Sequence, residues 1–588
     1  MILQALVAHY EALASQGQIA RPGWEKGKAS YALHIDEEGR LRAVLPLKTP
    51  TADGKRMVAR DMELPAGVKR TVGITANFLC DNAAYFLGIG DPDKPERALS
   101  CFEAAKKLHH ALLAKMGSHN PCAKAVCSFF EQWDVAIARE HPMFSEYMED
   151  FESGANIVFF FRDGYAQQDP EIKKGWQAYY ERDKGGEKMP CLVTGNPFVP
   201  EAVHPSIKGV FGAQSSGAAL VAFNAPAYCS FEREQSHNAP MGKYAAFAYT
   251  AALNHLLADR KHTKRIGDST VVYWAQGAER SYQDAFTQFM DRNDDVISDQ
   301  DLDDLMAVVA KGGVANWEGI PLLPTNCFYV LALAPNAARL SVRFFLRDDF
   351  SNIVRHLQEH YERIRIAKDH RSKFENIPLW ALLRETINEK STDKSPSPQM
   401  AGDTLRAVLT GGRYPATLYQ QTQLRIRAER TVSRGRAAII KGYLLKNAEH
   451  KDYKEVLWVE LNEQTTYQPY ILGRLFAVLV EVQDKASGVS TIHDKYFTSA
   501  CATPAVIFPM VMGLAGKHLR KLDGGIKTYY AKQIGELTRA ITKSYPAYHD
   551  LYDQGIFQLG YYHQTQKRYQ KKNGAEPKKE EIEYAGAD

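Results

Sequence analysis

The sequence predicts an α+β fold, in which an N-terminal module of mixed α/β structure precedes an all-helical C-terminal bundle. Two observations predict this fold. Before about residue 350, short β-like runs alternate with helical segments, whereas beyond residue 403 nearly every apolar pattern has helical spacing. The 588 residues are enough for about two to four domains. We therefore expect an α+β module at 1–350, a helix and linker at 351–402, the helical bundle at 403–570 and a disordered tail at 571–588.

The strands of the first module are expected at alternating or continuous apolar runs. Ala29–Ile35 and Leu41–Leu47 flank the turn Asp36–Gly39 and predict a hairpin. Further strands are expected at Ala155–Phe161, Leu220–Phe223, Thr270–Trp274, Phe328–Ala334 and Arg339–Phe345. Three- and four-residue apolar spacing predicts helices at Pro95–Met116, Cys122–Arg139 and Tyr244–Asp259.

The pattern changes after the last of these strands. Ser351–Lys368 reads as one charged helix, and Ser391–Met400 is polar and proline-bearing, as linkers are. The remaining helices are expected at 403–409, 415–427, 433–447, 467–485, 503–521 and 525–543.

Composition restricts the class of protein. The net charge is +4, from 73 basic and 69 acidic residues, which is too small to establish nucleic-acid binding without a local concentration of charge. The eight cysteines include no Cys-x-x-Cys pair, so neither a paired zinc site nor a secreted disulfide scaffold is expected. No run of about 18 apolar residues predicts a membrane span. We expect a cytoplasmic protein that needs no cofactor and no membrane.

Positive charge concentrates in residues 401–450, where nine basic residues stand against three acidic ones. Such a stripe can neutralise phosphates, and the interleaved Tyr414, Tyr419 and Tyr443 could stack on bases. The alternative is a solvated helix face. A second basic cluster follows at Lys517, Arg520, Lys521, Lys527 and Lys532.

One motif favours an enzyme. His356, Glu359 and His360 match H-x-x-E-H, in which two histidines one helical turn apart bind zinc and the glutamate acts as general base. The neighbouring Arg355 and Arg363 oppose a dication, and no third ligand is evident. The sequence also lacks a Walker A motif and Gly-x-Ser-x-Gly. We therefore expect a protein without catalytic activity, with a metal-dependent hydrolase as the alternative.

Two segments combine glycine with side chains that suit nucleic-acid recognition. In Lys69–Gly88, Lys69 and Arg70 precede Asn77 and Asn82. In Lys208–Asn224, glycines flank Gln214, Ser215 and Ser216. Small residues let backbone N–H groups approach a phosphate, and amide side chains can read base edges. An ordinary glycine-containing turn is the alternative.

These two segments resemble those of the large subunit of type I-C CRISPR Cascade complexes, and the resemblance continues in collinear order over about residues 1–570. Further similar segments are QSHNAPMGKYAAFAYTAALNHLL, RIGDSTVVYWA, NAARLSVRFFLRD, LTGGRYPATL, RAAIIKGYL, LGRLFAVL, YFTSACATPAVIFP and LGYYHQTQ. One departure is Thr565, where the family pattern leads us to expect arginine.

The resemblance implies a function in a crRNA-guided complex. Family members recognise the short PAM in duplex DNA, promote unwinding and R-loop formation, and support the displaced non-target strand, while guide pairing reads the remaining sequence. The implied partners are crRNA, the backbone, crRNA 5′-end-binding and small subunits, and a separate helicase–nuclease. The C-terminal part is expected to resemble the small subunit.

The same resemblance, together with the charge pattern, leads to expected DNA contacts. For the PAM and its duplex the expected residues are Lys28, Lys69, Arg70, Asn77, Asn82, Gln214, Ser215, Ser216, Asn224 and Asn238. For the displaced strand they are Arg425, Arg427, Arg430, Arg434 and Arg436, of which about half should face DNA because they lie on different sides of a helix.

Overall fold

The computed structural model describes residues 1–570, except for 51–56, 69–72, 115, 117–118, 182–184, 294–296, 369–371, 373, 449–452 and 454–455. The expected tail at 571–588 lies outside the described residues. The chain forms two compact units: unit 1 comprises residues 1–206 and 221–255, and unit 2 comprises 207–220 and 256–588. The expected module of residues 1–350 thus spans unit 1 and the first part of unit 2.

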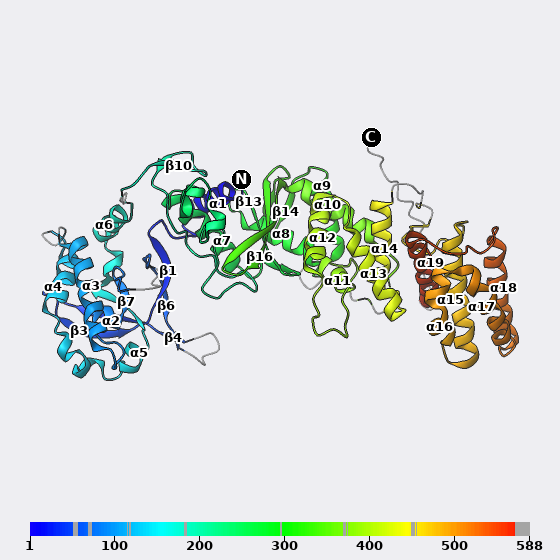
Figure 1. The fold of residues 1–588 in the computed structure, drawn as a ribbon, viewed down its shortest axis with the longest axis horizontal. Helices are drawn as coiled ribbons and strands as arrows, with labels where there is room; N and C mark the ends of the chain where they lie inside the picture. Colours follow the sequence, from blue (N-terminus) through cyan, green and yellow to red (C-terminus); the bar gives the residue numbers. More distant parts are fainter. Residues whose placement is uncertain are drawn as a thin grey trace. The chain divides into compact units, whose positions relative to one another are not determined.

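Unit 1, in which Figure 1 labels β3 and β7, is built around a five-stranded sheet. Its strands are β2 (Tyr31–Ile35), β3 (Leu41–Pro46), β7 (Cys80–Asn82), β8 (Asn156–Phe161) and β9 (Gly164–Tyr165). They follow the order β3-β2-β8-β7, with β9 paired to β8, and all pairs are antiparallel except β2 and β8. The predicted hairpin is therefore confirmed as β2 and β3.

Alternation along β8 explains how both faces of this sheet are covered. Ile157 and Phe159 face a core shared with α2 (Ala83–Phe86), α3 (Pro95–Leu113) and α4 (Pro121–Gln132). Val158 points to the opposite face, where it meets Ala29 and Leu64. Those two residues belong to a ribbon of β1 (Trp24–Ala29) and β6 (Arg60–Pro65).

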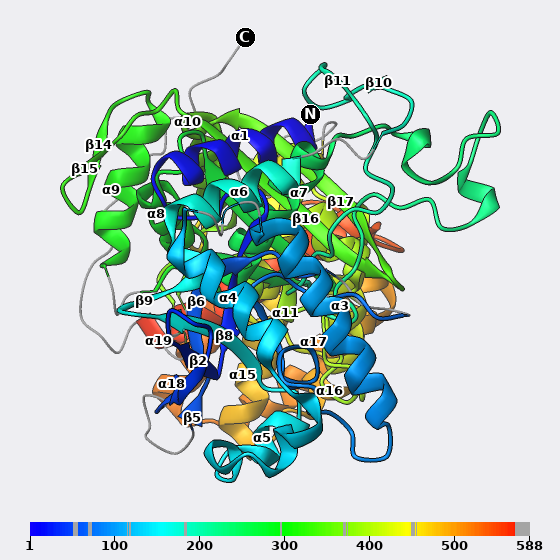
Figure 2. The ribbon, with the colours of Figure 1, turned by 90° about the vertical axis from the view of Figure 1, so that its left-hand side faces the viewer.

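The other elements of unit 1 surround this sheet or lie in the segment that follows it. They are α1 (Ile2–Ser15), β4 (Thr49–Pro50), β5 (Met57–Val58), α5 (Met148–Glu152), α6 (Pro170–Glu181), β10 (Met189–Pro190), β11 (Pro197–Phe198) and the start of α7 (Lys243–Ala258). Between β11 and α7 the described chain runs mainly as loops and short 3-10 turns (Figure 2). The strand expected at Leu220–Phe223 is wrong: residues 220 and 221 form bends, residues 222 and 223 are irregular, and the isolated bridges lie just before them, at residues 218 and 219.

Unit 2 begins with a four-stranded antiparallel sheet, ordered β12-β13-β16-β17. The strands are β12 (Thr263–Ile266), β13 (Ser269–Ala275), β16 (Cys327–Asn336) and β17 (Arg339–Asp349). A small hairpin of β14 (Ala315–Trp317) and β15 (Ile320–Leu322) lies apart from it. Every residue of β13 is buried, as expected for an apolar strand inside a sheet.

Helices account for the rest of unit 2 and share one continuous core with the sheet. They are α8 (Arg280–Asp291), α9 (Asp299–Ala310), α10 (Phe350–Ile364), α11 (Leu379–Arg384), α12 (Pro398–Thr410), α13 (Ala416–Glu429), α14 (Arg434–Asn447), α15 (Gln468–Ser487), α16 (Thr491–Ala502), α17 (Pro504–Leu519), α18 (Gly524–Ala540) and α19 (Leu551–Gln570). The predicted α+β class with a helical C-terminal part is confirmed. In the part of the chain that the structure describes, no helix is both long and apolar enough to cross a membrane.

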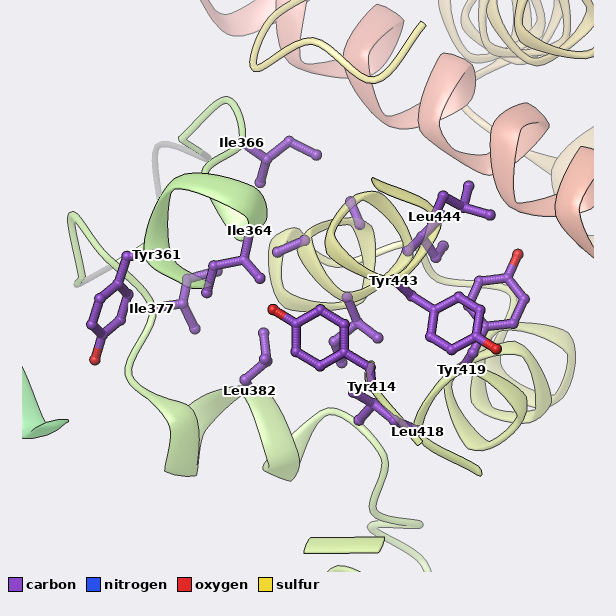
Figure 3. Packing of buried hydrophobic residues seen from close by; sticks show 14 of the residues in the cluster. Tyr361, Ile364, Ile366, Ile377, Leu382, Tyr414, Leu418, Tyr419, Tyr443 and Leu444 are labelled. Atoms are coloured by element: carbon purple, nitrogen blue, oxygen red, sulfur yellow. The ribbon is translucent and has the colours of Figure 1, made fainter. Parts of the chain in front are cut away.

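The three tyrosines expected to offer stacking surfaces lie in this core instead. Tyr414, Tyr419 and Tyr443 are each less than a tenth exposed. Figure 3 shows them among aliphatic side chains such as Leu382 and Leu418. The rings of Tyr419 and Tyr443 stack with centroids 4.5 Å apart. They stabilise the packing of α13 against α14, and the expected role in stacking on bases is wrong for them.

Candidate nucleic-acid interface

A loop of residues 208–217 in unit 2 carries the expected glutamine and serines. Ile207 and Ala218 close the loop through two reciprocal backbone hydrogen bonds of 2.9 and 2.8 Å. The next residue, Ala219, forms a parallel bridge with Arg339 at the start of β17. Both ends of the loop are therefore fixed at the edge strand of the sheet.

Contacts within the loop also hold its first half against the sheet. Val210 is buried, and the Phe211 backbone N–H donates to the Thr270 hydroxyl on β13 at 2.9 Å. The Arg265 guanidinium of β12 lies 3.2 Å from the centroid of the Phe211 ring, a cation–π contact. These contacts anchor the half of the loop that precedes its tip.

The tip projects Gln214, Ser215 and Ser216 into solvent. A turn closes beneath them, because the Gly217 N–H donates to the Gln214 carbonyl at 2.9 Å. Gly212 and Gly217 have φ angles of +75° and +98°, a left-handed conformation that glycine adopts without strain. An anchored loop with an exposed carboxamide and two hydroxyls can offer hydrogen bonds to base edges and phosphates.

Asn77 and Asn82 lie in unit 1, where one buried carboxylate positions both. The two oxygens of Asp81 accept from the backbone N–H groups of Asn77 at 2.8 Å and Asn82 at 2.9 Å. The Asn77 side-chain oxygen accepts from Val68 N–H at 2.9 Å, and that of Asn82 caps α2 by accepting from Ala84 N–H at 3.2 Å. The side-chain oxygens of Asn77 and Asn82 thus accept hydrogen bonds within the protein. Their side-chain NH₂ groups are the parts suited to donate to a ligand.

The structure brings Lys28 close to Asn82 through a residue that the sequence analysis missed. Asn156 on β8 is the cross-strand partner of Asn82, and its side-chain NH₂ donates to the Lys28 carbonyl at 3.1 Å. The Lys28 side chain is exposed on β1. Lys69 and Arg70 lie outside the described residues.

The two later asparagines differ in their surroundings. Asn224 is exposed in a loop. Asn238 uses both ends of its amide internally: its oxygen accepts from Ser230 N–H at 2.8 Å, and its NH₂ donates to the carbonyls of Arg233 at 2.8 Å and Gln235 at 3.0 Å. These bonds give Asn238 a structural role in its own loop.

Arg434 and Arg436 on α14 are buried and bound within the protein, at 8% and 6% exposure. Arg434 donates to the Phe374 and Glu375 carbonyls at 2.5 and 2.6 Å. Arg436 pairs with Glu429 and donates to the Glu385 carbonyl at 3.3 Å. A side chain committed in this way holds the helices around α14 together and presents little surface to DNA.

The other expected arginines lie on or just after α13. Arg425 has a largely buried side chain, 3.7 Å from the Glu429 carboxylate. Arg427 is exposed and donates to the Gln554 side chain at 2.8 Å. Arg430 is exposed and ends α13 with φ +57°. Within the predicted set, Arg427 and Arg430 are therefore the ones that solvent reaches most readily.

Both histidines of the H-x-x-E-H motif are engaged in packing. His360 is fully buried, with its Nδ1 2.7 Å from the Tyr414 hydroxyl. Burial lowers the pKa of His360 to about 3. His356 lies one turn earlier on α10, and its Nδ1 is 3.1 Å from the Leu409 carbonyl.

The glutamate of the motif is also occupied. Its two oxygens pair with guanidinium groups, Arg355 at 3.0 Å and Arg363 at 2.8 Å. Within residues 1–570, outside the gaps given above, no group of three or more His, Cys, Asp or Glu is arranged to hold a metal ion. The three side chains of the motif are therefore engaged in contacts within the protein.

A protein-family model described as "CRISPR-associated protein (Cas_Csd1)" matches residues 6–569. The chain belongs to the Cas_Csd1 family. The match covers elements of both units, and it confirms the CRISPR association that the sequence resemblance indicated. A search of curated proteins finds no match.

In this Cas_Csd1 chain, the second basic cluster is more accessible than the predicted arginine set. Its residues are all exposed at the end of α17 and along α18: Lys517, Arg520, Lys521, Lys527 and Lys532. Tyr529, also on α18, has 44% of its surface exposed. The sequence shows this cluster as five basic residues with one acidic residue among them. It does not show which of the two basic stretches is buried and which faces solvent.

Proposed function

We propose that the chain is a non-catalytic large subunit of a crRNA-guided type I-C Cascade. It recognises the PAM in duplex DNA, promotes unwinding and R-loop formation, supports the displaced non-target strand and permits recruitment of a separate helicase–nuclease. Its partners are crRNA, the backbone, crRNA 5′-end-binding and small subunits, and target DNA. Membership of the CRISPR-associated Cas_Csd1 family supports a role in this kind of complex.

The observation that carries the DNA-reading part of the proposal is the anchored loop with Gln214 at its exposed tip. A glutamine carboxamide has a donor and an acceptor side by side, the arrangement that pairs with an adenine edge in the major groove. A side chain on an anchored loop can also enter between base pairs and promote unwinding. Ser215 and Ser216 would hold the adjacent phosphates.

Unit 1 supplies further contacts in this proposal. The NH₂ groups of Asn77 and Asn82 would donate to base edges or phosphates, and exposed Lys28 would neutralise a phosphate near Asn82. Asn224 is exposed, and we propose that it contacts the duplex. Asn238 acts indirectly, because its hydrogen bonds shape its own loop.

For the displaced strand, we propose contact with exposed Arg427 and Arg430 and with the basic cluster on α17 and α18. Exposed lysines and arginines neutralise phosphates, and the exposed ring of Tyr529 offers a stacking surface. Arg425, Arg434 and Arg436 would contribute indirectly, by fixing α13 and α14.

Replacing the tip glutamine tests the proposal. In the assembled complex, Gln214→Ala should reduce discrimination between PAM and non-PAM duplexes by about 5- to 100-fold, the effect of one base-reading side chain. The measurement is target-duplex affinity across a PAM library.

Gln300→Ala is the matched control, since Gln300 is also an exposed glutamine of unit 2 but lies on α9. This variant should keep full discrimination. An equal loss of affinity by Gln214→Ala on every PAM would contradict the assigned role.

A further inference from the structure

A cleft in unit 1 combines positive charge with aromatic rings. It has a volume of about 1210 Å³ and lies among the turn after α1, α6 and the start of α7. Four basic side chains line it: Arg21, Lys173, Lys174 and Lys243. Among the described residues of its lining, Glu63 is the one acid, so basic residues exceed acidic ones by three.

Two of the lysines are held against aromatic rings of the same cleft. The Lys243 ammonium lies 3.4 Å from the centroid of the Tyr180 ring and also donates to the Tyr180 carbonyl. The Lys173 ammonium lies 5.2 Å from the centroid of the Trp24 ring and 2.9 Å from the Glu63 carboxylate. These contacts fix two positive charges beside flat apolar surfaces.

The other two basic residues extend the charge toward solvent. Arg21 and Lys174 are exposed at the cleft. Tyr244 also lines the cleft with 41% of its surface exposed, and its hydroxyl donates to the Glu11 carboxylate at 3.2 Å. An exposed ring in the same cleft as basic side chains offers a base a surface on which to stack.

We propose that this cleft binds a short segment of single-stranded nucleic acid. Lys174, Lys243 and Arg21 would neutralise phosphates, Lys173 would remain paired with Glu63, and Tyr244 would stack on a base. The site is separate from the loop at 208–217 and from the basic cluster on α17 and α18, both of which belong to unit 2. The inference rests on the cleft alone and holds whether or not the chain reads a PAM.

Two features favour a nucleic acid over other anionic ligands. The volume exceeds the range of about 300–1,000 Å³ that is usual for small-molecule pockets, so a polymer segment fits better than one small anion. Three of the four basic residues are lysines, which act as point charges on phosphates, whereas carboxylates of an acidic peptide are best matched by paired arginines.

The test measures binding of a fluorescent single-stranded RNA of about 12 nucleotides to the purified full-length chain, with DNA of the same sequence as a second probe. Arg21→Ala/Lys174→Ala should lower affinity about tenfold or more. It should also reduce the slope of log affinity against log salt by about 1.4, the value for two lost phosphate contacts on a single strand. Comparing the probes shows whether RNA or DNA is preferred.

A second pair of variants tests the ring. Tyr244→Ala should weaken binding by about fivefold or more, while Tyr244→Phe, which keeps the ring and loses the bond to Glu11, should bind like the wild type. Lys107→Ala is the control for charge, because Lys107 is exposed on α3 of the same unit and does not line the cleft. Circular dichroism confirms that each variant is folded.

Three results would overturn the proposal. The first is an affinity of Arg21→Ala/Lys174→Ala equal to that of the charge control. The second is equal loss for Tyr244→Ala and Tyr244→Phe with no change in salt slope for the double variant. The third is variant-sensitive binding of a glutamate-rich peptide without binding of either oligonucleotide, which would assign the cleft to an acidic protein partner.

Discussion

Lys441 shows how a single residue of the basic stripe differs in role from its neighbours. It lies on α14 with 1% of its surface exposed, and its ammonium donates to the Arg363 carbonyl at 3.1 Å. Burial, assisted by the charge of Arg365, lowers the pKa of Lys441 to about 8. The lysine therefore carries its charge at neutral pH at a cost in stability.

Because the pKa of Lys441 is lowered in the folded protein, this residue makes the stability depend on pH. Between about pH 8 and pH 10.5, the unfolded chain holds a proton on Lys441 that the folded chain has lost, so this residue makes stability rise with pH by up to about 1.4 kcal/mol per unit. Lys441→Met lacks that titration. The unfolding free energy of the variant relative to wild type should thus fall as pH rises from 8 to 10, measured by denaturant unfolding.

Lys485→Met, at an exposed position on α15, controls for the loss of a lysine and should show no such trend. A constant difference between Lys441→Met and wild type across pH 8–10 would show that Lys441 does not titrate there.

The roles of individual residues were the feature of the site that the sequence predicted least well. Gln214, Ser215 and Ser216 are exposed as expected, because flanking glycines indicate a turn. Arg434 and Arg436 have the same residue type as Arg430 but are buried, and no sequence pattern tells these cases apart. Their buried positions depend on hydrogen bonds to the carbonyls of Phe374 and Glu385, which are 60 and 51 positions away in the sequence.

At the scale of elements, α15 and α19 approach so closely that their backbones touch. A Cβ placed on Gly473 would lie 1.9 Å from the Phe557 carbonyl oxygen, and one on Gly560 would lie 2.2 Å from the Tyr470 carbonyl oxygen. Each helix thus places a glycine against the backbone of the other. Glycine is required at both positions because any side chain would separate the helices.

Gly473→Ala should therefore destabilise the helical part of unit 2 by about 2 kcal/mol or more, since backbone atoms cannot yield as a flexible side chain would. Chemical denaturation of purified protein gives the measurement. Gly535→Ala, on α18 with nothing within 4 Å of its Cβ, should instead stabilise by up to about 1 kcal/mol through helix propensity. Equal behaviour of the two variants would refute the close approach.

Spacing predicted most of the long helices and the longer strands but missed many short elements, and one long helix was missed for a physical reason. The expected helix at 467–485 corresponds to α15, and the strand at 155–161 to β8. In contrast, α19 was missed, because its buried face carries polar side chains and so has no apolar pattern. These buried polar residues include Gln554, Gln558, His563, Gln564 and Gln566. The amides of Gln558 and Gln423 pair across the core at 2.8 and 2.9 Å.

For the whole molecule, buried neutral histidines occur in both units. Burial lowers the pKa of His9, His360 and His563 to about 3, and that of His109 and His204 to about 4. In the unfolded chain each would titrate near 6.5. Above pH 6.5 both states are neutral at these positions, and below it the unfolded state takes up protons that the folded state excludes.

Stability should consequently fall as pH drops from about 6.5 toward 4, by up to about 1.4 kcal/mol per pH unit for each such histidine. Thermal unfolding followed by circular dichroism from pH 7.5 to 5 should show a midpoint that falls increasingly steeply as the pH drops below about 6.5. His119→Ala, which removes an exposed histidine, should keep the same dependence. A midpoint that does not change over this range would contradict the prediction.

The fold class of the whole chain was predictable from the sequence, but its division into two units was not. Alternating strands and helices followed by helices gave α+β correctly. The unit boundary was not evident, because residues 207–220 return to the sheet of unit 2 through the bridge between Ala219 and Arg339 on β17. Pairings between distant segments leave no local pattern.

The central claim is that this chain confers PAM-dependent DNA opening on a crRNA-guided complex. The most direct test assembles the complex with crRNA and the partner subunits, with and without the chain, and measures R-loop formation on a PAM library over a salt series. Our account predicts stable R-loops and PAM preference only when the chain is present, with affinity that falls as salt rises. PAM-selective R-loops of equal stability without the chain would contradict it.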